Sequence, residues 1–364
     1  MRKPIRIKDI AAKAQVSTGT VDRVIHNRGN VSPDVRERVK KVIEELGYQR
    51  NILASTLAYN KQARVICLLP ESDSDLFWAQ THDGIQKAIK SVHHFGLMVD
   101  PMFFDFEQPS SFKETANKAL EAKPDGIVFP PIFSKESLWF ADQCKQRNIP
   151  FVIINTNLEG VEPVCYLGQD SFQSGILGAK LLNLGQKGEK VFCILNLDYR
   201  TKSAQHLLKK ENGFRAYFDG LGEAEVRIFR KDFHQFNDAE KLKKFLLNLL
   251  DSYPNLKGIF VTNSRAFKVL DCMGELLQRK SISIVGYDLI APNIKYLKQN
   301  RINFLINQHP YDQGFKAVHN LFRYLIRKEE IEKTQYLRLD VVLKENFHYH
   351  VDESSLEAAD QVIL

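Results

Sequence analysis

Nine runs of bulky apolar residues recur between residues 64 and 308, separated by segments long enough for amphipathic helices. Uninterrupted rather than alternating apolar strands are typical of parallel sheets that helices cover on both faces. Because nine strands are more than a single sheet usually contains, the pattern predicts two doubly wound α/β lobes. The runs are RVICLLP (64–70), GLMVDPMFF (96–104), DGIVFPP (125–131), PFVIINT (150–156), KVFCILN (190–196), VRIFR (226–230), KGIFVTN (257–263), ISIVGYD (282–288) and INFLINQ (302–308).

Positive charge is concentrated at the N-terminal end of the chain. Residues 1–64 contain 14 Lys/Arg against 6 Asp/Glu, a net charge of +8, whereas the rest of the chain contains 37 against 38. With 364 residues, of which 44% are hydrophobic and 26% charged, the chain is long enough for two or three globular domains. A basic N-terminal module beside a nearly neutral body is typical of a protein that contacts phosphates.

The first fifty residues predict three helices. Apolar residues recur at helical spacing in IKDIAAKAQ (7–15), Ser17 can cap a second helix, and Ser32-Pro33 begins a third helix that Gly47 ends. Two short helices that are joined by a tight turn and braced by a longer one form a helix-turn-helix. The polar stretch at 18–20 is then the start of a recognition helix, which must approach base edges in the major groove.

The segment IKDIAAKAQVSTGTVDRVIHNRGNVSPDVRERVKKVIEELGYQRN, continuing through ILASTLA, closely resembles the DNA-binding head and hinge of the lactose-repressor (LacI) family of bacterial regulators. The resemblance implies that Thr18 and Gly19 face bases and that Arg23 reaches guanine or phosphate. The Thr18 methyl group suits a thymine methyl, whereas Gly19 has no side chain with which to read a base. The residues expected to bind DNA are Thr18, Gly19, Thr20, Asp22, Arg23, Arg28, Asn30, Asn51 and Leu57.

Asp22 departs from the family pattern, which usually has Ser or a similar neutral residue directed toward backbone phosphate. A carboxylate repels phosphate unless a cation such as Arg23 or Arg28 neutralises it. Alternatively, the carboxylate accepts a hydrogen bond from a cytosine amino group. The sequence leaves both interpretations open.

Residues 51–63 predict a hinge helix and linker. Asn51 can cap a helix of about two turns with Leu53 and Leu57 on one face, and a helix this short is marginal alone in water. The resemblance implies that it forms on the operator as a dimer pair, where Leu57 wedges into the minor groove and bends the duplex. The alternative is that Leu57 packs onto the next domain.

The strand-helix pattern after residue 64 resembles the periplasmic sugar-binding-protein fold, which forms the effector domain of the same regulator family. The resemblance implies three crossings of the chain between the lobes. The helix-turn-helix domain is expected at 1–50, the effector domain at 64–345 and a C-terminal tail at 346–364. Lobe 1 is expected at 64–157 and 290–316, and lobe 2 at 158–289 and 317–345.

Polar side chains follow the predicted strands at their carboxyl ends, where open α/β sheets bind ligands. Carboxylates and amides beside aromatic rings suit a sugar, because its hydroxyls pair with the polar groups while its apolar face stacks on a ring. Asp288 and Gln308 match the sugar-binding relatives best, and Gln169 lies near a crossing. The family often has an arginine against the ligand in this region, and Arg200, His206 or Lys210 could take its place here; Arg200 is the one included below. The expected effector-binding residues are Asp75, Phe77, Trp78, Asn155, Thr156, Asp170, Arg200, Asn263, Asp288 and Gln308.

The chain carries few signs of catalytic chemistry. It has no GxGxxG after a strand, no P-loop spacing and no HExxH, so we expect no catalytic residue, cofactor or metal ion. Its five cysteines are scattered without a CxxC pair, and no apolar run reaches the length of a membrane span. The charged N-terminus lacks the apolar segment of a signal peptide, which predicts a cytoplasmic protein.

These observations predict a homodimeric, DNA-binding transcription regulator, specifically a repressor, whose partners are operator DNA and a small effector between the lobes. The expected effector is a sugar or sugar derivative, and a nucleoside- or purine-responsive regulator of the same family is the alternative. A secreted solute-binding protein fits less well, because it needs a signal peptide and lacks a basic head. An enzyme would have to convert the bound ligand.

Overall fold

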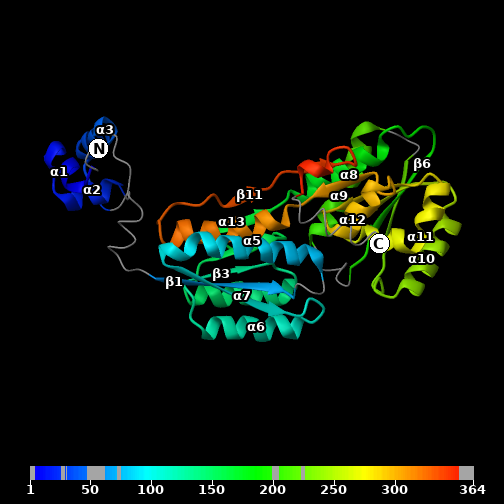
Figure 1. Ribbon diagram of the computed structural model, residues 1–364, viewed down its shortest axis with the longest axis horizontal. Coiled ribbons are helices and arrows are strands. Elements are labelled where there is room, and N and C mark those ends of the chain that lie inside the picture. The colour runs from blue at the N-terminus through cyan, green and yellow to red at the C-terminus, as the bar shows by residue number, and fades with distance from the viewer. Residues whose placement is uncertain are drawn as a thin grey trace.

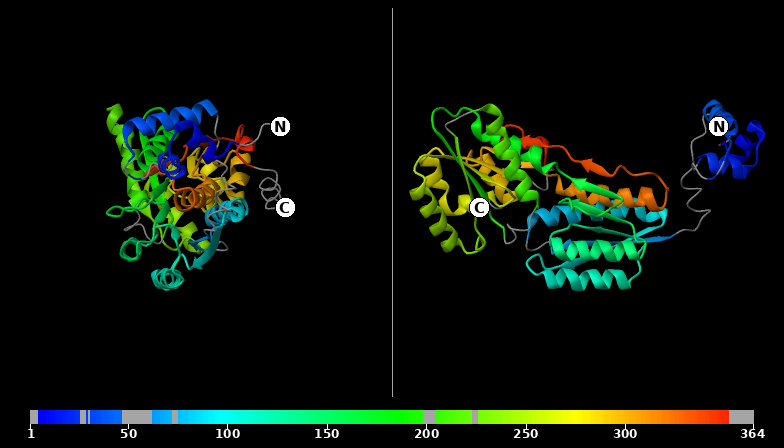
Figure 2. Two further views of the ribbon diagram at one scale, coloured as in Figure 1. Left: turned by 90° about the vertical axis from the view of Figure 1, so that its left-hand side faces the viewer. Right: turned by 180° about the vertical axis from the view of Figure 1, so that it is seen from behind.

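The computed structural model describes residues 5–25, 29, 31–46, 62–71, 75–198, 205–222 and 226–351. A three-helix head precedes two lobes, and each lobe is built on a six-stranded sheet (Figure 1). Helices cover both faces of each sheet, as Figure 2 shows from two further sides. The predicted fold class, an all-α head followed by an effector domain of two doubly wound lobes, is confirmed.

The head has its own small core. Its helices are α1 (Ile7–Ala14), α2 (Thr18–Ile25) and α3 (Pro33–Leu46). Ile10 of α1, Val21 of α2 and Val39 of α3 are fully buried where the three helices meet. The helical spacing of apolar residues therefore predicts both the helices and the faces that they bury.

Lobe 1 contains a parallel sheet in the order β11-β5-β4-β3-β1-β2. Helices α5 (Leu76–Val92) and α13 (Pro310–Leu325) cover one face, and α6 (Pro109–Glu121) and α7 (Ser134–Gln146) cover the other. Alternate residues of β1 enter opposite cores, and for this reason the strand is an unbroken apolar run. The strands are β1 (Ala63–Pro70), β2 (Leu97–Phe104), β3 (Gly126–Phe129), β4 (Phe151–Asn155), β5 (Cys165–Gly168) and β11 (Thr334–Tyr336).

Lobe 2 repeats this plan in the order β12-β10-β9-β8-β6-β7, and β12 runs antiparallel to β10. Helices α8 (Ser171–Asn183) and α9 (Gln205–Leu221) cover one face. The other face is covered by α10 (Ala239–Ser252), α11 (Ala266–Arg279) and α12 (Ala291–Lys298). The strands are β6 (Lys190–Asn196), β7 (Val226–Asp232), β8 (Leu256–Val261), β9 (Ser283–Tyr287), β10 (Phe304–Asn307) and β12 (Asp340–Val342). Short 3-10 turns lie at His93–Phe95 and Phe347–Tyr349.

The structure corrects the expected division between the lobes. The chain crosses after β5, after β10 and between β11 and β12. Residues 158–168 and 317–336 therefore belong to lobe 1, and residues 290–307 belong to lobe 2, the reverse of the sequence-based assignment. Helix α13 packs on lobe 1. Strand pairing decides this division, and β5, β11 and β12 are too short to stand out as apolar runs.

Gln169 ties the three crossings together rather than facing a ligand. Its Nε2 donates to the carbonyl oxygen of Asn307 at 2.5 Å and to that of Arg338 at 2.8 Å. Gln169 is itself 5% exposed. One side chain from the first crossing therefore holds the second and the third together.

Two general expectations can be compared with these elements. Cys67, Cys144, Cys165 and Cys193 are buried free thiols, as their apolar surroundings in the sequence predict, and Cys272 is half-buried. Burial raises the pKa of the Cys144 thiol to about 12. Within the described part of the chain, no helix is both long enough and apolar enough to span a bilayer.

Each lobe contains one pair of helices in unusually close contact. In lobe 2, a Cβ on Gly175 of α8 would collide with the carbonyl oxygen of Lys210, and a Cβ on Gly213 of α9 with that of Phe172. In lobe 1, Gly84 of α5 and Gly314 of α13 have the same relation to the facing backbone. Only glycine permits backbones to approach this closely, so these glycines set the spacing of the helices that carry the cleft residues.

We expect Gly213→Ala to lower the free energy of unfolding by about 2 kcal/mol or more, because the methyl group must displace backbone of α8. The matched control is Gly220→Ala in the same helix, where an added Cβ meets no atom within 4 Å. The control should be neutral or stabilising by up to about 1 kcal/mol, because alanine is the better helix former. Urea unfolding followed by circular dichroism measures both, and equal effects of the two variants would contradict this explanation.

Candidate functional site

The first turn of α2 presents Thr18 and Gly19 to solvent. Ser17 caps the turn, since its Oγ accepts the backbone N–H of Thr20 at 3.1 Å and lies 2.9 Å from the Thr20 hydroxyl. Arg23, one turn later, is also exposed. The helix-turn-helix therefore offers a small polar surface and a cation at the positions expected to meet DNA.

Two of the expected DNA-binding residues are partly withdrawn from this surface. Thr20 is half-buried and its hydroxyl pairs with Ser17, and Asp22 is half-buried on the flank of α2. Four further residues of the set lie outside the described residues, namely Arg28, Asn30, Asn51 and Leu57. The predicted hinge helix also lies outside them.

A cavity of about 200 Å³ lies between the lobes, at the carboxyl ends of the strands. It is lined from lobe 1 by the start of α5 and the segment after β4, and from lobe 2 by the ends of β6 and β8 and the start of α9. Most of the expected effector-binding residues meet there, although their strands are far apart in the sequence. Those that line the cavity are Asp75, Phe77, Trp78, Asn155, Thr156, Asn263 and Gln308.

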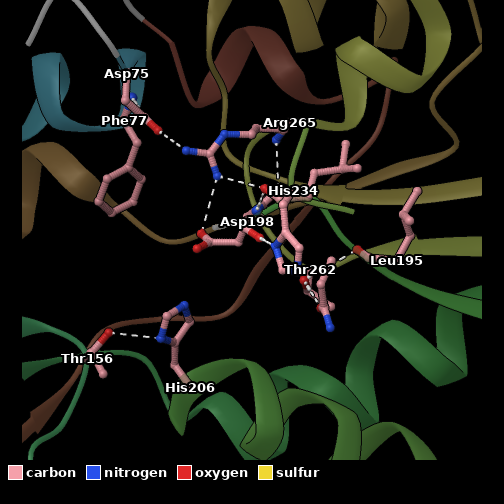
Figure 3. Close-up of polar contacts among 12 residues, drawn as sticks. Asp75, Phe77, Thr156, Leu195, Asp198, His206, His234, Thr262 and Arg265 are labelled. Atoms are coloured by element: carbon pink, nitrogen blue, oxygen red, sulfur yellow. Dashed lines mark hydrogen bonds and ion pairs between the residues drawn. The ribbon is translucent and has the colours of Figure 1, made fainter. Parts of the chain in front are cut away.

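Arg265 of lobe 2 lines the cavity, and Figure 3 shows its contacts with Asp75 and Asp198. Its guanidinium donates to Asp75 of lobe 1 at 2.8 Å and to the carbonyl oxygen of Leu197 at 3.0 Å, and lies 3.5 Å from the Asp198 carboxylate. Its planar face lies over the Phe236 ring, with 4.6 Å between Cζ and the ring centroid. The group is therefore fixed by carboxylates at its edge and by an aromatic ring on its face.

Further contacts arrange the rest of the wall. Thr156 of lobe 1 and His206 of lobe 2 form a hydrogen bond of 3.1 Å across the cleft, as Figure 3 shows. Phe77 and Trp78 pack edge to face with centroids 4.9 Å apart, and both line the cavity. Polar atoms and aromatic rings therefore face the same space, which is the combination that binds polyhydroxylated or planar small molecules.

A buried charge network lies beneath Gln308. Lys210 Nζ donates to the carbonyl oxygen of Thr262 at 2.8 Å and to Gln308 Oε1 at 3.2 Å, and lies 3.5 Å from the centroid of the Tyr287 ring. Gln308 in turn donates from Nε2 to Asp288 at 2.7 Å and from its backbone N–H at 3.0 Å. Burial lowers the pKa of Lys210 and raises that of Asp288, and their mutual attraction opposes both shifts. Gln308 therefore bridges a buried cation and a buried carboxylate.

Two expected effector-binding residues, Asp288 and Asp170, do not line the cavity, and a third lies outside the described residues. Asp288 is fully buried behind Gln308, which satisfies both of its carboxylate oxygens. Asp170 instead caps α8 by accepting the backbone N–H groups of Phe172 and Gln173. Arg200 lies outside the described residues. The sequence identifies strand ends correctly, but strand position alone does not reveal which side chain a neighbour covers.

The structure also brings in residues that the sequence-based set omits. Arg265 and Asp198 stand two residues after Asn263 and Asn196, so an extension of the strand-end rule by two residues would have found them. Phe106 follows β2 in the same way. His206 and Lys210, named only as substitutes for Arg200, both line the cavity.

We expect Lys210→Met to lower the free energy of unfolding by about 3 kcal/mol, because it leaves the Asp288 carboxylate buried without its cation. The double variant Lys210→Met/Asp288→Asn removes both charges and should recover part of the loss. Urea unfolding of the single and double variants tests this expectation. A double variant less stable than Lys210→Met would show that the two charges do not support one another.

Comparison with known proteins agrees with this division of the chain. Residues 6–51 match the family model described as "Bacterial regulatory proteins, lacI family", and residues 65–329 match the one described as "Periplasmic binding protein domain". Catabolite control protein A of Staphylococcus xylosus is 30% identical, over 60% of this chain and 68% of that protein. The ribose operon repressor of Bacillus subtilis is 24% identical, over 90% of this chain and 94% of that protein.

A solved structure described as a LacI transcriptional regulator, from Bacteroides fragilis, has a TM-score of 0.72 at 28% identity and covers 79% of this chain and 99% of its own. A glucose-galactose binding protein from Geobacillus stearothermophilus shares the fold, with a TM-score of 0.70 at 20% identity over 79% of this chain and 99% of its own. The predicted resemblance is confirmed in both parts of the molecule. The chain belongs to the LacI family of DNA-binding bacterial transcription regulators, with a periplasmic-binding-protein-like effector domain.

Proposed function

We propose that this regulator is a cytoplasmic homodimeric repressor that binds a near-palindromic operator through two helix-turn-helix heads and is controlled by a sugar in the interlobe cavity. The observation that carries the proposal is the cavity itself. Carboxylates, amides and a guanidinium from both lobes line it beside aromatic rings. An effector that contacts both lobes can shift the equilibrium between two lobe arrangements. The size of the shift is limited to the difference in the effector's affinity for the two arrangements.

The sugar class is supported by the chemistry of the wall. Asp75, Asp198 and Arg265 form a polar group of acceptors and donors, and Phe77 and Trp78 supply an apolar surface for the face of a pyranose or furanose ring. Relatives described as a ribose operon repressor and as MalR match 83% or more of this chain. A nucleoside is the alternative effector, because a base can stack on the same rings.

The heads are proposed to read DNA through Thr18 and Arg23, whose side chains are exposed on α2. A dimer places two such helices in successive major grooves, so the operator should carry two half-sites related by a two-fold axis. The expected roles of Arg28, Asn30, Asn51 and Leu57 belong to this proposal and rest on the family resemblance alone.

A thermal-shift screen of the full chain with monosaccharides, disaccharides and nucleosides tests the effector assignment. A true effector at a hundred times its Kd should stabilise the protein by about 2.7 kcal/mol. A shift with nucleosides alone would replace the sugar assignment. No shift with any compound, together with unchanged operator binding, would reject both effector classes.

For the effector that the screen identifies, we expect Thr156→Val to weaken binding by roughly five- to tenfold, because the substitution keeps the side-chain shape and removes one hydroxyl from the cavity. The matched control is Thr115→Val. Both threonines are 9% exposed, but Thr115 lies on α6 and its hydroxyl donates to the carbonyl oxygen of Phe103, away from the cavity. Calorimetric titration should show normal affinity for the control, and equal losses in both variants would remove Thr156 from the site.

Asp22→Ser tests the two interpretations of the unusual carboxylate in α2. If Asp22 only adds repulsion near phosphate, the variant should bind operator and random DNA more tightly. If it accepts a hydrogen bond from cytosine, the variant should lose about 1–3 kcal/mol on the operator alone. Titrations of both DNAs at one salt concentration separate these outcomes, because the phosphate contribution depends strongly on salt.

A further inference from the structure

We propose that Asp75, Arg265 and Asp198 form a latch through which the chain holds its own lobes together, so that the effector acts on an equilibrium already biased toward contact between the lobes. The inference rests on the proposed function only in placing the effector in this cavity. Asp75 begins α5 in lobe 1, whereas Asp198 follows β6 and Arg265 precedes α11 in lobe 2. The ion pair between Asp75 and Arg265 therefore spans the cleft.

Each half of the latch is also held by contacts within its own lobe. Asp75 is the N-cap of α5, and its Oδ1 accepts the Phe77 backbone N–H at 3.0 Å while Oδ2 faces Arg265. In lobe 2, Arg265 donates to the carbonyl oxygen of Leu197, and Phe236 covers its guanidinium. Joining two groups whose positions are already set costs little conformational entropy, so more of their attraction remains to hold the lobes together.

The position of Arg265 between two carboxylates explains why contact between the lobes needs this arginine. Asp75 and Asp198 both lie against Arg265, so without the guanidinium two carboxylates from opposite lobes would share one site. Like charges held close together repel one another, and the repulsion is stronger where water is partly excluded. The side chains of Asp75 and Arg265 are both 10% exposed. With Arg265 present, the attraction of both carboxylates to its guanidinium favours contact between the lobes. Without Arg265, the repulsion between Asp75 and Asp198 opposes that contact.

A second ion pair across the cleft provides an internal comparison. Glu159 of lobe 1 and Lys209 of α9 lie 3.1 Å apart, but their side chains are 73% and 40% exposed. Ion pairs this accessible to water contribute little, because solvent and salt screen them. The latch is therefore assigned to the buried pair and not to interlobe ion pairs in general.

The lobe arrangement can be measured without knowing the effector. One spin label is placed on α7 of lobe 1 by Lys135→Cys and one on α10 of lobe 2 by Glu240→Cys, both exposed positions, in a Cys272→Ser background. Pulsed electron-electron double resonance on the full chain, mixed with excess unlabelled chain, gives the distribution of interlobe distances. It is recorded for the otherwise unchanged protein and for three variants, Asp75→Asn, Arg265→Gln and Glu159→Gln.

Asp75→Asn removes the charge but keeps a good helix N-cap, so α5 should remain intact. We expect this variant to reduce the fraction of short interlobe distances by about fivefold, which corresponds to a modest change in free energy. Arg265→Gln should reduce it further, because it removes the cation that lies against both carboxylates. Glu159→Gln should leave the distribution unchanged.

Unchanged distances in Asp75→Asn and Arg265→Gln, with normal circular dichroism spectra, would overturn the latch. An equal change in Glu159→Gln would overturn the assignment to the buried pair. Operator titration of the same samples keeps the two proposals apart. Loss of specific operator binding by the otherwise unchanged protein would count against the proposed function, whereas normal operator binding with unchanged distances would count against the latch alone.

Discussion

Burial of the strands on both faces is the constraint on which the rest of the effector domain depends. In β1, Val65 and Cys67 enter one core while Ile66 and Leu68 enter the other, and β6 repeats this alternation in lobe 2. Strands buried in this way are joined by helical crossovers and run parallel, so their carboxyl ends meet at one edge of each sheet. The two edges face one another across the cleft, and the cavity lies between them.

The charged groups of the cleft are arranged at two depths. Arg265 and its two carboxylates lie at the cavity wall, where lobe 1 meets lobe 2. Lys210 and Asp288 lie deeper and are joined by Gln308, a residue of the second crossing between the lobes. Gln308 lines the cavity and follows Asn307, whose carbonyl oxygen Gln169 holds. The cavity wall and the second crossing between the lobes are therefore adjacent along the chain.

The head and the effector domain solve different physical problems. The head is stabilised by a small core around Ile10 and Val21, and its exposed surface carries the polar and basic groups suited to DNA. The lobes bury many more apolar residues, and several of their buried polar groups, such as Asp198 and Arg265, lie at the cleft. The charge asymmetry of the sequence follows from this division, since phosphate binding requires positive charge in the head alone.

Elements whose signals are local can be predicted from the sequence. Apolar periodicity and the Ser32-Pro33 start define the head, unbroken apolar runs define nine strands, and polar residues such as Asn155 and Asn263 mark strand ends that reach the cavity. These features depend on residues a few positions away, and the local sequence therefore contains what is needed to predict them.

Features that depend on distant partners emerge only once the chain has folded. Strand pairing sets the lobe to which each of β5, β11 and β12 belongs. A strand of three or four residues is too short for its sequence to indicate which strand it pairs with. Asp288 and Gln308 both follow strands, yet packing places one behind the other. Arg265 pairs with Asp75, which is 190 positions away in the chain, so no local pattern predicts this contact. Local sequence encodes a side chain's chemistry and its place in an element, but long-range packing alone fixes which groups meet.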